Sequence, residues 1–275
     1  MSQLLLIYDD NCPLCQWYTQ VFVKTGLLPA GGRVPYSTMS PRLQALIDAD
    51  KGRNQIPLVD LQTGQTWYGL DALLEVLGRR FPLIKHIGHL PIIYWFLTRL
   101  YRLISYNRKI VVANRCSPGS FDCAPDFNQR YRFLFLFITL LLNTGLLALV
   151  YNRLLQHLPG NTLSMTQVQA AHFLLVSVNL ALALILKKER ALEYLGQVTM
   201  LALIALLLQT PLLLLSAFVL PASWLLVVYF SLSSLVVFRE YLRRMDYAGL
   251  LVRHRWMAAF NLVCMTAFLL FVFKS

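Results

Sequence analysis

Two cysteines lie three residues apart near the start of the chain, Cys12 and Cys15 in the stretch "YDDNCPLC". They follow a short apolar run, "LLLIY", and open a segment with helical periodicity, so we expect them at a junction between a strand and a helix. Backbone N–H groups and the macrodipole at a helix N-terminus stabilise a thiolate, and can lower a thiol pKa from about 8.5 to roughly 3.5–7.5. The second cysteine, one turn later, can resolve a mixed disulfide from within. The pattern therefore predicts thiol–disulfide exchange with Cys12 as nucleophile and Cys15 as resolving thiol.

Asp9 stands just before this dithiol and has two interpretations. A carboxylate within hydrogen-bond reach of Cys15 could take up its proton, as general bases do. An aspartate before a helical run could instead cap the helix, which is a common use of this residue. The sequence leaves both interpretations open.

A second pair, Cys116 and Cys123, brackets the segment "SPGSFD". It could be a second redox pair that exchanges with Cys12 and Cys15, it could complete a four-thiolate zinc site, or it could be two free thiols. We expect no metal and no cofactor for the dithiol chemistry, with a quinone between helices as an alternative and zinc as a weaker one. Cys264 is single and lies in an apolar run, where packing is its default use.

The elements around the first pair indicate a small α/β unit over residues 1–82. After "LLLIY" and a helix that Gly26 ends, "RVPYSTM" reads as extended and "LQALIDAD" as helical. "IPLVDL" is a strand, Thr63-Gly64 a hairpin turn into "QTWYG", and "LDALLEVLGRRF" a closing helix with apolar residues at 3–4 spacing.

Three segments carry a family resemblance: "YDDNCPLC" at 8–15, "YGLDALLEVL", and "YRLISYNRK" at 101–109. Over about residues 3–115 they resemble the DCC family of predicted thiol-disulfide oxidoreductases, named for an aspartate and two cysteines that Asp9, Cys12 and Cys15 match. The family usually has Gly where this chain has Asp10. The resemblance implies a thioredoxin-like fold, in which a cis-proline before a buried strand faces the dithiol. Pro57, in Ile56-Pro57, is the candidate for that position.

Residues 83–130 differ from the unit before them. "LIKHIGHLPIIYWFLTRLYRLI" mixes aromatic and basic residues, and predicts either an amphipathic helix lying at the membrane interface or a helix docked on the small domain. The polar stretch that follows holds the second cysteine pair. We treat residues 83–130 as a connector.

Residues 131–275 are predicted to form a membrane domain. The chain is 57% hydrophobic and only 14% charged, whereas a soluble domain has about 25% charged residues. Uncharged runs of spanning length cover 133–151, 168–186, 194–238 and 256–273. The third is long enough for two crossings that turn near Pro221, so the pattern indicates five membrane-spanning helices.

Basic residues alternate across these spans. They precede the first span, follow the second and lie between the fourth and fifth, which places the N-terminal domain in the cytosol and the C-terminus outside. The start of the chain shows no secretory signal, and we expect a multi-pass protein of the cell inner (cytoplasmic) membrane. The net charge of +12 is concentrated beside apolar runs, and without a matching motif it does not indicate nucleic-acid binding.

The overall expectation is a thioredoxin-like α/β domain followed by an all-α transmembrane bundle, acting as a membrane-anchored thiol–disulfide oxidoreductase. Its partners would be the lipid bilayer and a protein or small-molecule thiol or disulfide. The alternative is a non-enzymatic membrane protein, transporter-like or an assembly factor, whose cysteines are structural or bind zinc. A quinone-linked relay is a third class.

Overall fold

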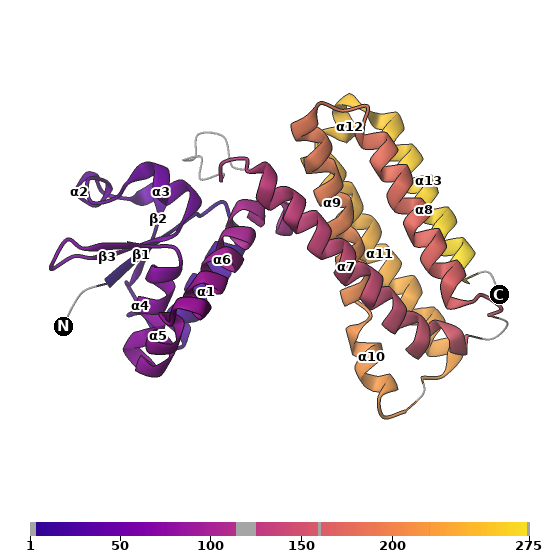
Figure 1. Cartoon of the computed structure of the whole chain (residues 1–275), viewed down its shortest axis with the longest axis horizontal. Helices are drawn as coiled ribbons and strands as arrows, with labels where there is room; N and C mark the ends of the chain where they lie inside the picture. Colours follow the sequence, from indigo (N-terminus) through magenta and orange to yellow (C-terminus); the bar gives the residue numbers. More distant parts are fainter. Residues whose placement is uncertain (1–3, 114–124, 159–160, 220, 274–275) are drawn as a thin grey trace. The chain divides into compact units, whose positions relative to one another are not determined.

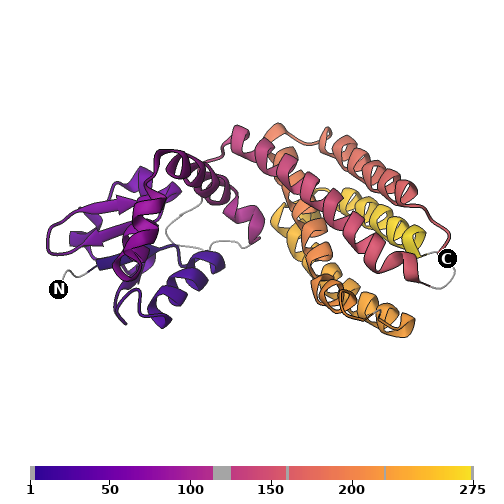
Figure 2. The ribbon, with the colours of Figure 1, turned by 60° about the horizontal axis from the view of Figure 1, so that its bottom comes forward.

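The structure is a computed structural model that describes residues 4–113, 125–158, 161–219 and 221–273. The chain divides into two compact units, residues 1–132 and 133–275, and each is considered by itself (Figures 1 and 2).

The first unit consists of four strands and several helices. Its strands are β1 (Leu4–Tyr8), β2 (Arg33–Pro35), β3 (Pro57–Asp60) and β4 (Thr66–Tyr68). Its helices are α1 (Pro13–Lys24), the 3-10 turn η1 (Tyr36–Thr38), α2 (Pro41–Gln44), α3 (Ala49–Asn54), α4 (Leu70–Arg80), α5 (Pro82–Gly88) and α6 (Pro91–Val111). The first turn of α7 (Gln129–Arg153) also belongs to it.

The strands form one mixed sheet in the order β2-β1-β3-β4. β1 runs parallel to β2 and antiparallel to β3, and β3 pairs antiparallel with β4 through the turn at Gly64. α1 connects the parallel pair, and α4 follows the hairpin. This arrangement confirms the expected thioredoxin-like α/β fold.

Both faces of the sheet are covered, because the central strands alternate apolar side chains between two cores. Leu4, Leu6 and Leu58 pack on one face with residues of α1 and α4. Ile7 and Val59 point to the other face, against the segment that contains η1 and α2. β1 therefore ends between two packed layers, and the residues after Tyr8 emerge at the rim of the sheet.

Three predicted elements differ from the structure. The extended run expected over "RVPYSTM" is the strand β2 followed by the 3-10 turn η1. The single helix expected over "LIKHIGHLPIIYWFLTRLYRLI" is divided into α5 and α6. The helix expected over "LQALIDAD" is two short helices, α2 and α3. Asp48 interrupts the helix expected over "LQALIDAD", because its side chain accepts hydrogen bonds from the N–H groups of Asp50 and Lys51. An aspartate in that role starts a new helix.

α6 is docked on the sheet unit by one of its faces. Tyr101, Ser105 and Arg108 lie on that face and reach backbone groups of residues 53–56. This is the docking arrangement that the sequence left as one of two alternatives for the segment. The opposite face of α6 is described below.

The second unit is helical. It contains most of α7, η2 (Leu155–His157), α8 (Met165–Ala183), α9 (Lys188–Leu207), α10 (Thr210–Ser216), α11 (Ser223–Tyr247), α12 (Leu250–Arg253) and α13 (Arg255–Phe273). Five stretches are long and apolar enough to cross a membrane, and they confirm the predicted number: Gln129–His157, Met165–Ala183, Lys188–Ser216, Ser223–Tyr247 and Arg255–Val272.

Buried polar side chains tie these helices together, as they commonly do in membranes. The Asn179 side-chain oxygen accepts hydrogen bonds from Tyr194 and Asn261, which links α8, α9 and α13. Arg244 of α11 donates to Gln197 of α9 at 2.6 Å.

Candidate redox-active dithiol site

The loop between β1 and α1 places Cys12 at a helix N-terminus. The N–H of Cys12 donates to the Asp9 carbonyl at 3.1 Å, and the N–H of Asn11 donates to the Asp9 side chain at 2.9 Å. Cys12 is the N-cap residue of α1, and Pro13 follows in the first turn, where its missing N–H costs no hydrogen bond. Within the described ranges no residue other than glycine has a positive φ, so Asp10 fits this turn with an ordinary backbone.

The two thiols lie in direct contact. The Cys15 thiol donates to Cys12 Sγ at 2.7 Å, and the Cys15 backbone N–H points at the same sulfur from 3.3 Å. The two cysteines are free and not joined as a disulfide. Both are buried, with 4% and 5% of their surfaces exposed, so a bulky substrate reaches Cys12 only when nearby side chains move.

These contacts shift the pKa values of the two thiols in opposite directions. The hydrogen bond from the Cys15 thiol lowers the pKa of Cys12 to about 7 against the effect of burial, with help from the Cys15 N–H and Arg108. The same hydrogen bond, together with burial, raises the pKa of Cys15. The geometry therefore favours a Cys12 thiolate beside a protonated Cys15.

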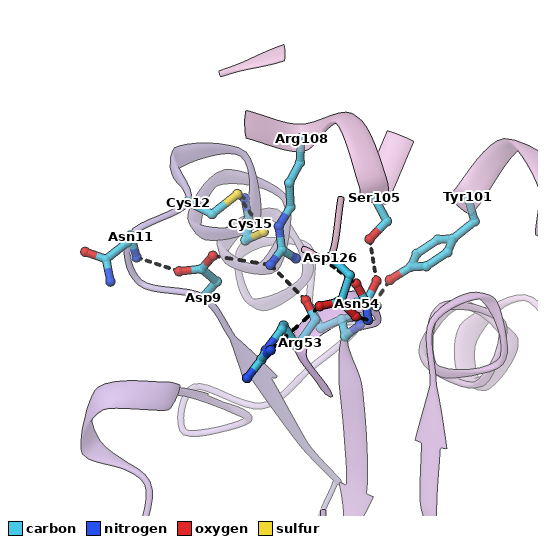
Figure 3. Close-up of polar contacts among 11 residues, drawn as sticks. Asp9, Asn11, Cys12, Cys15, Arg53, Asn54, Tyr101, Ser105, Arg108 and Asp126 are labelled. Carbon is cyan, nitrogen blue, oxygen red and sulfur yellow. Dashed lines mark hydrogen bonds and ion pairs between the residues drawn. The ribbon is translucent and has the colours of Figure 1, made fainter. Parts of the chain in front are cut away.

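A buried ion pair lies next to the dithiol. Arg108 Nη2 is 3.5 Å from Asp9 Oδ2, and both side chains are nearly inaccessible, at 9% and 3% exposed. Figure 3 shows Arg108 reaching from α6 toward Asp9 and the two sulfurs. Among the described residues, Asp9 Oδ2 receives no hydrogen bond, so this oxygen keeps a lone pair for a proton.

Three more contacts hold Arg108 and α6 in place (Figure 3). Arg108 Nη2 also donates to the Arg53 carbonyl at 3.1 Å. The Ser105 hydroxyl donates to the Asn54 carbonyl, and the Tyr101 hydroxyl accepts from the Ile56 N–H at 3.0 Å. Burial raises the pKa of Tyr101 to about 12, so this phenol stays neutral.

A small cavity joins the ion pair to the resolving thiol. Its volume is about 10 Å³, which is room for about one water molecule. Asp9, Cys15 and Arg108 line it, together with Ile56 and Tyr36. The cavity therefore offers a path of one water between the Cys15 thiol and the Asp9 carboxylate.

Two expectations for this site need correction. The Ile56–Pro57 peptide bond is trans, since the described residues contain no cis peptide bond; Pro57 opens β3 opposite Tyr68, and Ile56 is the residue that reaches the cavity. Asp9 does not cap α1, because Cys12 occupies the cap position. Asp9 instead closes the turn before it.

The second cysteine pair, Cys116 and Cys123, lies outside the described residues. Its boundary is described: Asp126 N–H donates to the Asn54 side-chain oxygen at 2.9 Å, and the Asn54 amide donates to the Asp126 carboxylate at 2.6 Å. Among the residues that the structure does describe, no three His, Cys, Asp or Glu side chains are grouped to hold a metal.

Arg108 is the site residue that sequence reasoning missed. It appears in "YRLISYNRK" only as part of a motif and as one of the basic residues before the first span. The available signal was helical spacing: Tyr101, Ser105 and Arg108 recur at four and three residues and so share one face. Helical spacing does not predict that this face of α6 packs against the loop between β1 and α1.

A sheet of thioredoxin type with a CxxC dithiol at the start of its first helix, in a chain with five candidate spans, defines a membrane protein with a thiol–disulfide domain. Residues 6–112 match the family model of the DCC1-like thiol-disulfide oxidoreductases, which confirms the resemblance drawn from the motifs. No curated protein and no solved structure shows a significant match to the chain.

Proposed function

We propose that the protein is a membrane-anchored thiol–disulfide oxidoreductase that uses Cys12 as nucleophile and Cys15 as resolving thiol. The observation that carries the proposal is the contact at the start of α1, where a protonated Cys15 donates to Cys12 Sγ at 2.7 Å. A dithiol held this way has one sulfur ready to attack and a second ready to follow.

The first step is an attack of the Cys12 thiolate on a substrate disulfide. The substrate S–S bond breaks, one substrate sulfur leaves as a thiolate that takes a proton from solvent, and the other sulfur is joined to Cys12. Backbone N–H groups at the start of α1 and the charge of Arg108 stabilise the thiolate before attack.

The second step needs the Cys15 proton to leave, because only a thiolate attacks a disulfide. Asp9 accepts that proton through a water in the small cavity. The Cys15 thiolate then attacks Cys12 Sγ, the mixed disulfide breaks, and the second substrate thiolate is released. Two electrons have passed from the dithiol to the substrate, and Cys12 and Cys15 are joined. The reverse sequence oxidises a substrate dithiol.

Cys116 and Cys123 are the proposed exchange partners of the first pair within the chain. Support comes from Asp126, which follows Cys123 by three residues and is hydrogen-bonded to Asn54. Asn54 is next to Arg53, whose carbonyl accepts from Arg108. The end of the segment that carries the second pair is therefore anchored beside the residues that surround the first.

Trapping tests the assignment. A Cys15→Ser protein should accumulate mixed disulfides through Cys12, visible as adducts on a non-reducing gel after acid quenching and alkylation, whereas Cys12→Ser should form none. Cys264→Ser is the matched control and should behave as the unmodified protein. Peptide mapping of the adducts distinguishes an external substrate from Cys116 or Cys123. If Cys15→Ser forms no adduct through Cys12, the catalytic role is wrong.

Asp9 is tested separately, with both cysteines in place. Loss of a general base typically costs about 10²–10⁴-fold in rate, so Asp9→Asn should slow the release of the mixed disulfide by about 10²-fold while adduct formation continues. An Asp9→Asn protein that resolves its adducts as fast as the unmodified protein would show that Asp9 takes no part in proton transfer.

A further inference from the structure

The outer face of α5 and α6 exposes large apolar side chains that nothing in the first unit covers. The exposed fractions are 71% for Leu83, 83% for Ile92, 61% for Trp95 and 58% for Phe96. Ile87 and Leu90, between them, are also exposed. We call these six residues the α5–α6 apolar face. Large apolar side chains exposed on two consecutive helices of a folded domain indicate an interaction site.

Helical spacing separates this face from the docked one. Trp95 and Phe96 lie three and four residues after Ile92, and Arg99 lies four and three residues after them, so the four share one stripe. Tyr101, Ser105 and Arg108, which reach the site, lie on the opposite side of α6. One face of α6 packs against the N-terminal domain, and the opposite face exposes apolar side chains.

Beyond Arg99 the same side of α6 is covered, since Leu103 is buried, and it reaches the first turn of α7. Two turns beyond Arg99 it meets Tyr106, whose ring stacks on Tyr131 with centroids 5.1 Å apart. The neighbouring Asn107 amide donates to the Tyr131 carbonyl at 3.2 Å. Tyr131 is in the first turn of α7, the first candidate span. The stripe therefore ends against the first turn of α7.

Charge indicates which surface the face meets. No acidic residue occurs between Glu75 and Asp122, whereas Arg99 and Arg102 are exposed along α6. The Arg99 guanidinium lies over the Trp95 ring at 5.5 Å. Tryptophan and arginine on an amphipathic helix, without acidic neighbours, fit the boundary between head groups and acyl chains of an anionic bilayer.

We propose that the α5–α6 apolar face lies in the lipid interface of an anionic bilayer, with Trp95 inserted at the level of the head groups and Arg99 and Arg102 bound to lipid phosphates. Such a contact keeps the thioredoxin-like domain on the membrane surface and restricts its dithiol to substrates within reach of that surface. The proposal does not depend on the chemistry of Cys12 and Cys15.

Quenching of tryptophan emission by brominated lipid tests this placement in the full-length protein. The chain is reconstituted in phosphatidylcholine vesicles with phosphatidylglycerol, and the emission of Trp95 is the difference between the unmodified protein and Trp95→Phe. Brominated acyl chains should reduce that component at least about twofold, as expected for an interfacial ring. The matched control is Trp17→Phe, because Trp17 is exposed to a similar extent, 65%, on α1, and its component should not change.

Two outcomes of the quenching experiment would contradict the proposal. Quenching of the Trp95 component that does not exceed that of Trp17 would show that the face is not in lipid, and that a protein or a second copy of the chain covers it. Quenching that is equal in pure phosphatidylcholine would remove the role of anionic head groups. Both variants keep an aromatic ring at the position, so the fold is not at risk.

Discussion

The reactivity of Cys12 depends on two buried charges of opposite sign. Arg108 lowers the pKa of the Cys12 thiol and Asp9 raises it, in addition to the larger effect of the Cys15 hydrogen bond. Both charges are desolvated, so neither is screened as a surface charge would be. The two side chains also form an ion pair, so the Cys12 thiol experiences the difference between their opposing effects.

The pH dependence of Cys12 alkylation measures this balance. In the unmodified protein the rate should rise with pH around a midpoint near pH 7, because the Cys12 pKa is lowered to about 7. Arg108→Gln should move the midpoint to higher pH, since the stabilising cation is lost. Asp9→Asn should move it to lower pH, since the opposing anion is lost. Iodoacetamide labelling with mass spectrometry gives the profile, because a small reagent suits a buried sulfur.

Two control variants distinguish an electrostatic shift of the alkylation midpoint from a loss of folding. Removing one partner of a buried ion pair typically costs about 3–5 kcal/mol, so Arg108→Gln could weaken the fold. Arg108→Lys keeps the charge and should bring the midpoint back toward that of the unmodified protein. Arg80→Gln removes an exposed arginine from α4 and should leave the profile unchanged. Midpoints that move in the same direction for Arg108→Gln and Asp9→Asn would contradict the arrangement.

At the scale of elements, α6 is the helix that completes the site. β1 and α1 supply the dithiol and Asp9, but α6 supplies Arg108 and closes the cavity. Its position depends on Tyr101, whose hydroxyl accepts from the Ile56 N–H. Tyr101 in turn packs against Gly69, the residue that leads into α4. The position of α6, and with it that of Arg108, therefore depends on Gly69, which has no side chain.

Gly69 has φ +60°, and a methyl group there would lie 2.7 Å from the Gln55 side-chain oxygen and 3.0 Å from the Tyr101 ring. Gly69→Ala should destabilise the N-terminal domain by about 2 kcal/mol, because a residue other than glycine in such a conformation costs about 1–3 kcal/mol. It should also speed labelling of Cys12, since displacement of Tyr101 loosens α6. Thermal unfolding followed by thiol exposure provides the measurement.

Gly31→Ala is the matched control, because an added Cβ at Gly31 meets nothing within 4 Å. That variant should unfold at the temperature of the unmodified protein. If the two alanine variants have equal stability, the backbone at Gly69 tolerates a side chain and the proposed dependence of α6 on this position fails.

At the scale of the whole molecule, five spans are an odd number, so five crossings would place the two ends of the chain on opposite sides of the bilayer. Basic residues beside membrane spans are enriched on the cytosolic side, which predicts a cytosolic N-terminal domain for this chain. Arg130 and Arg132 lie in the first turn of the first candidate span, and Arg253 and Arg255 lie just before and at the start of the last. Arg108 and Arg132 are both buried and are not exposed loop charges, which leaves Arg130 as the exposed arginine at the start of α7.

Tags at the two ends test the orientation. In intact cells, a C-terminal tag should be open to an added protease and an N-terminal tag should be protected until the membrane is permeabilised. The predicted cause is charge, so replacing the exposed Arg130 with glutamine should weaken the preference. Protection of the C-terminal tag, or exposure of the N-terminal one, would contradict the predicted topology.

Much of the fold and part of the site followed from the sequence. β1, α1, the hairpin and the five spans depend on local periodicity, on turn residues such as Gly64 and on uninterrupted apolar runs, which act within a few residues. Cys12 and Cys15 are a local pair for the same reason. The prediction of one helix over "LQALIDAD" was wrong because hydrophobic periodicity does not register a single capping residue, and Asp48 divides this segment into α2 and α3.

The rest was decided by tertiary structure. Arg108 and Asp9 are far apart in the sequence, and no local pattern states that α6 returns to the end of β1. The trans bond at Pro57, the contact of Tyr101 with Ile56 and the cavity beside Cys15 also arise from packing between elements. Local patterns were enough to predict a dithiol at a helix start in a chain with several membrane spans, because those features depend on neighbouring residues. Only the folded domain decided which charges surround the dithiol, because electrostatic environment depends on distances in space and on burial.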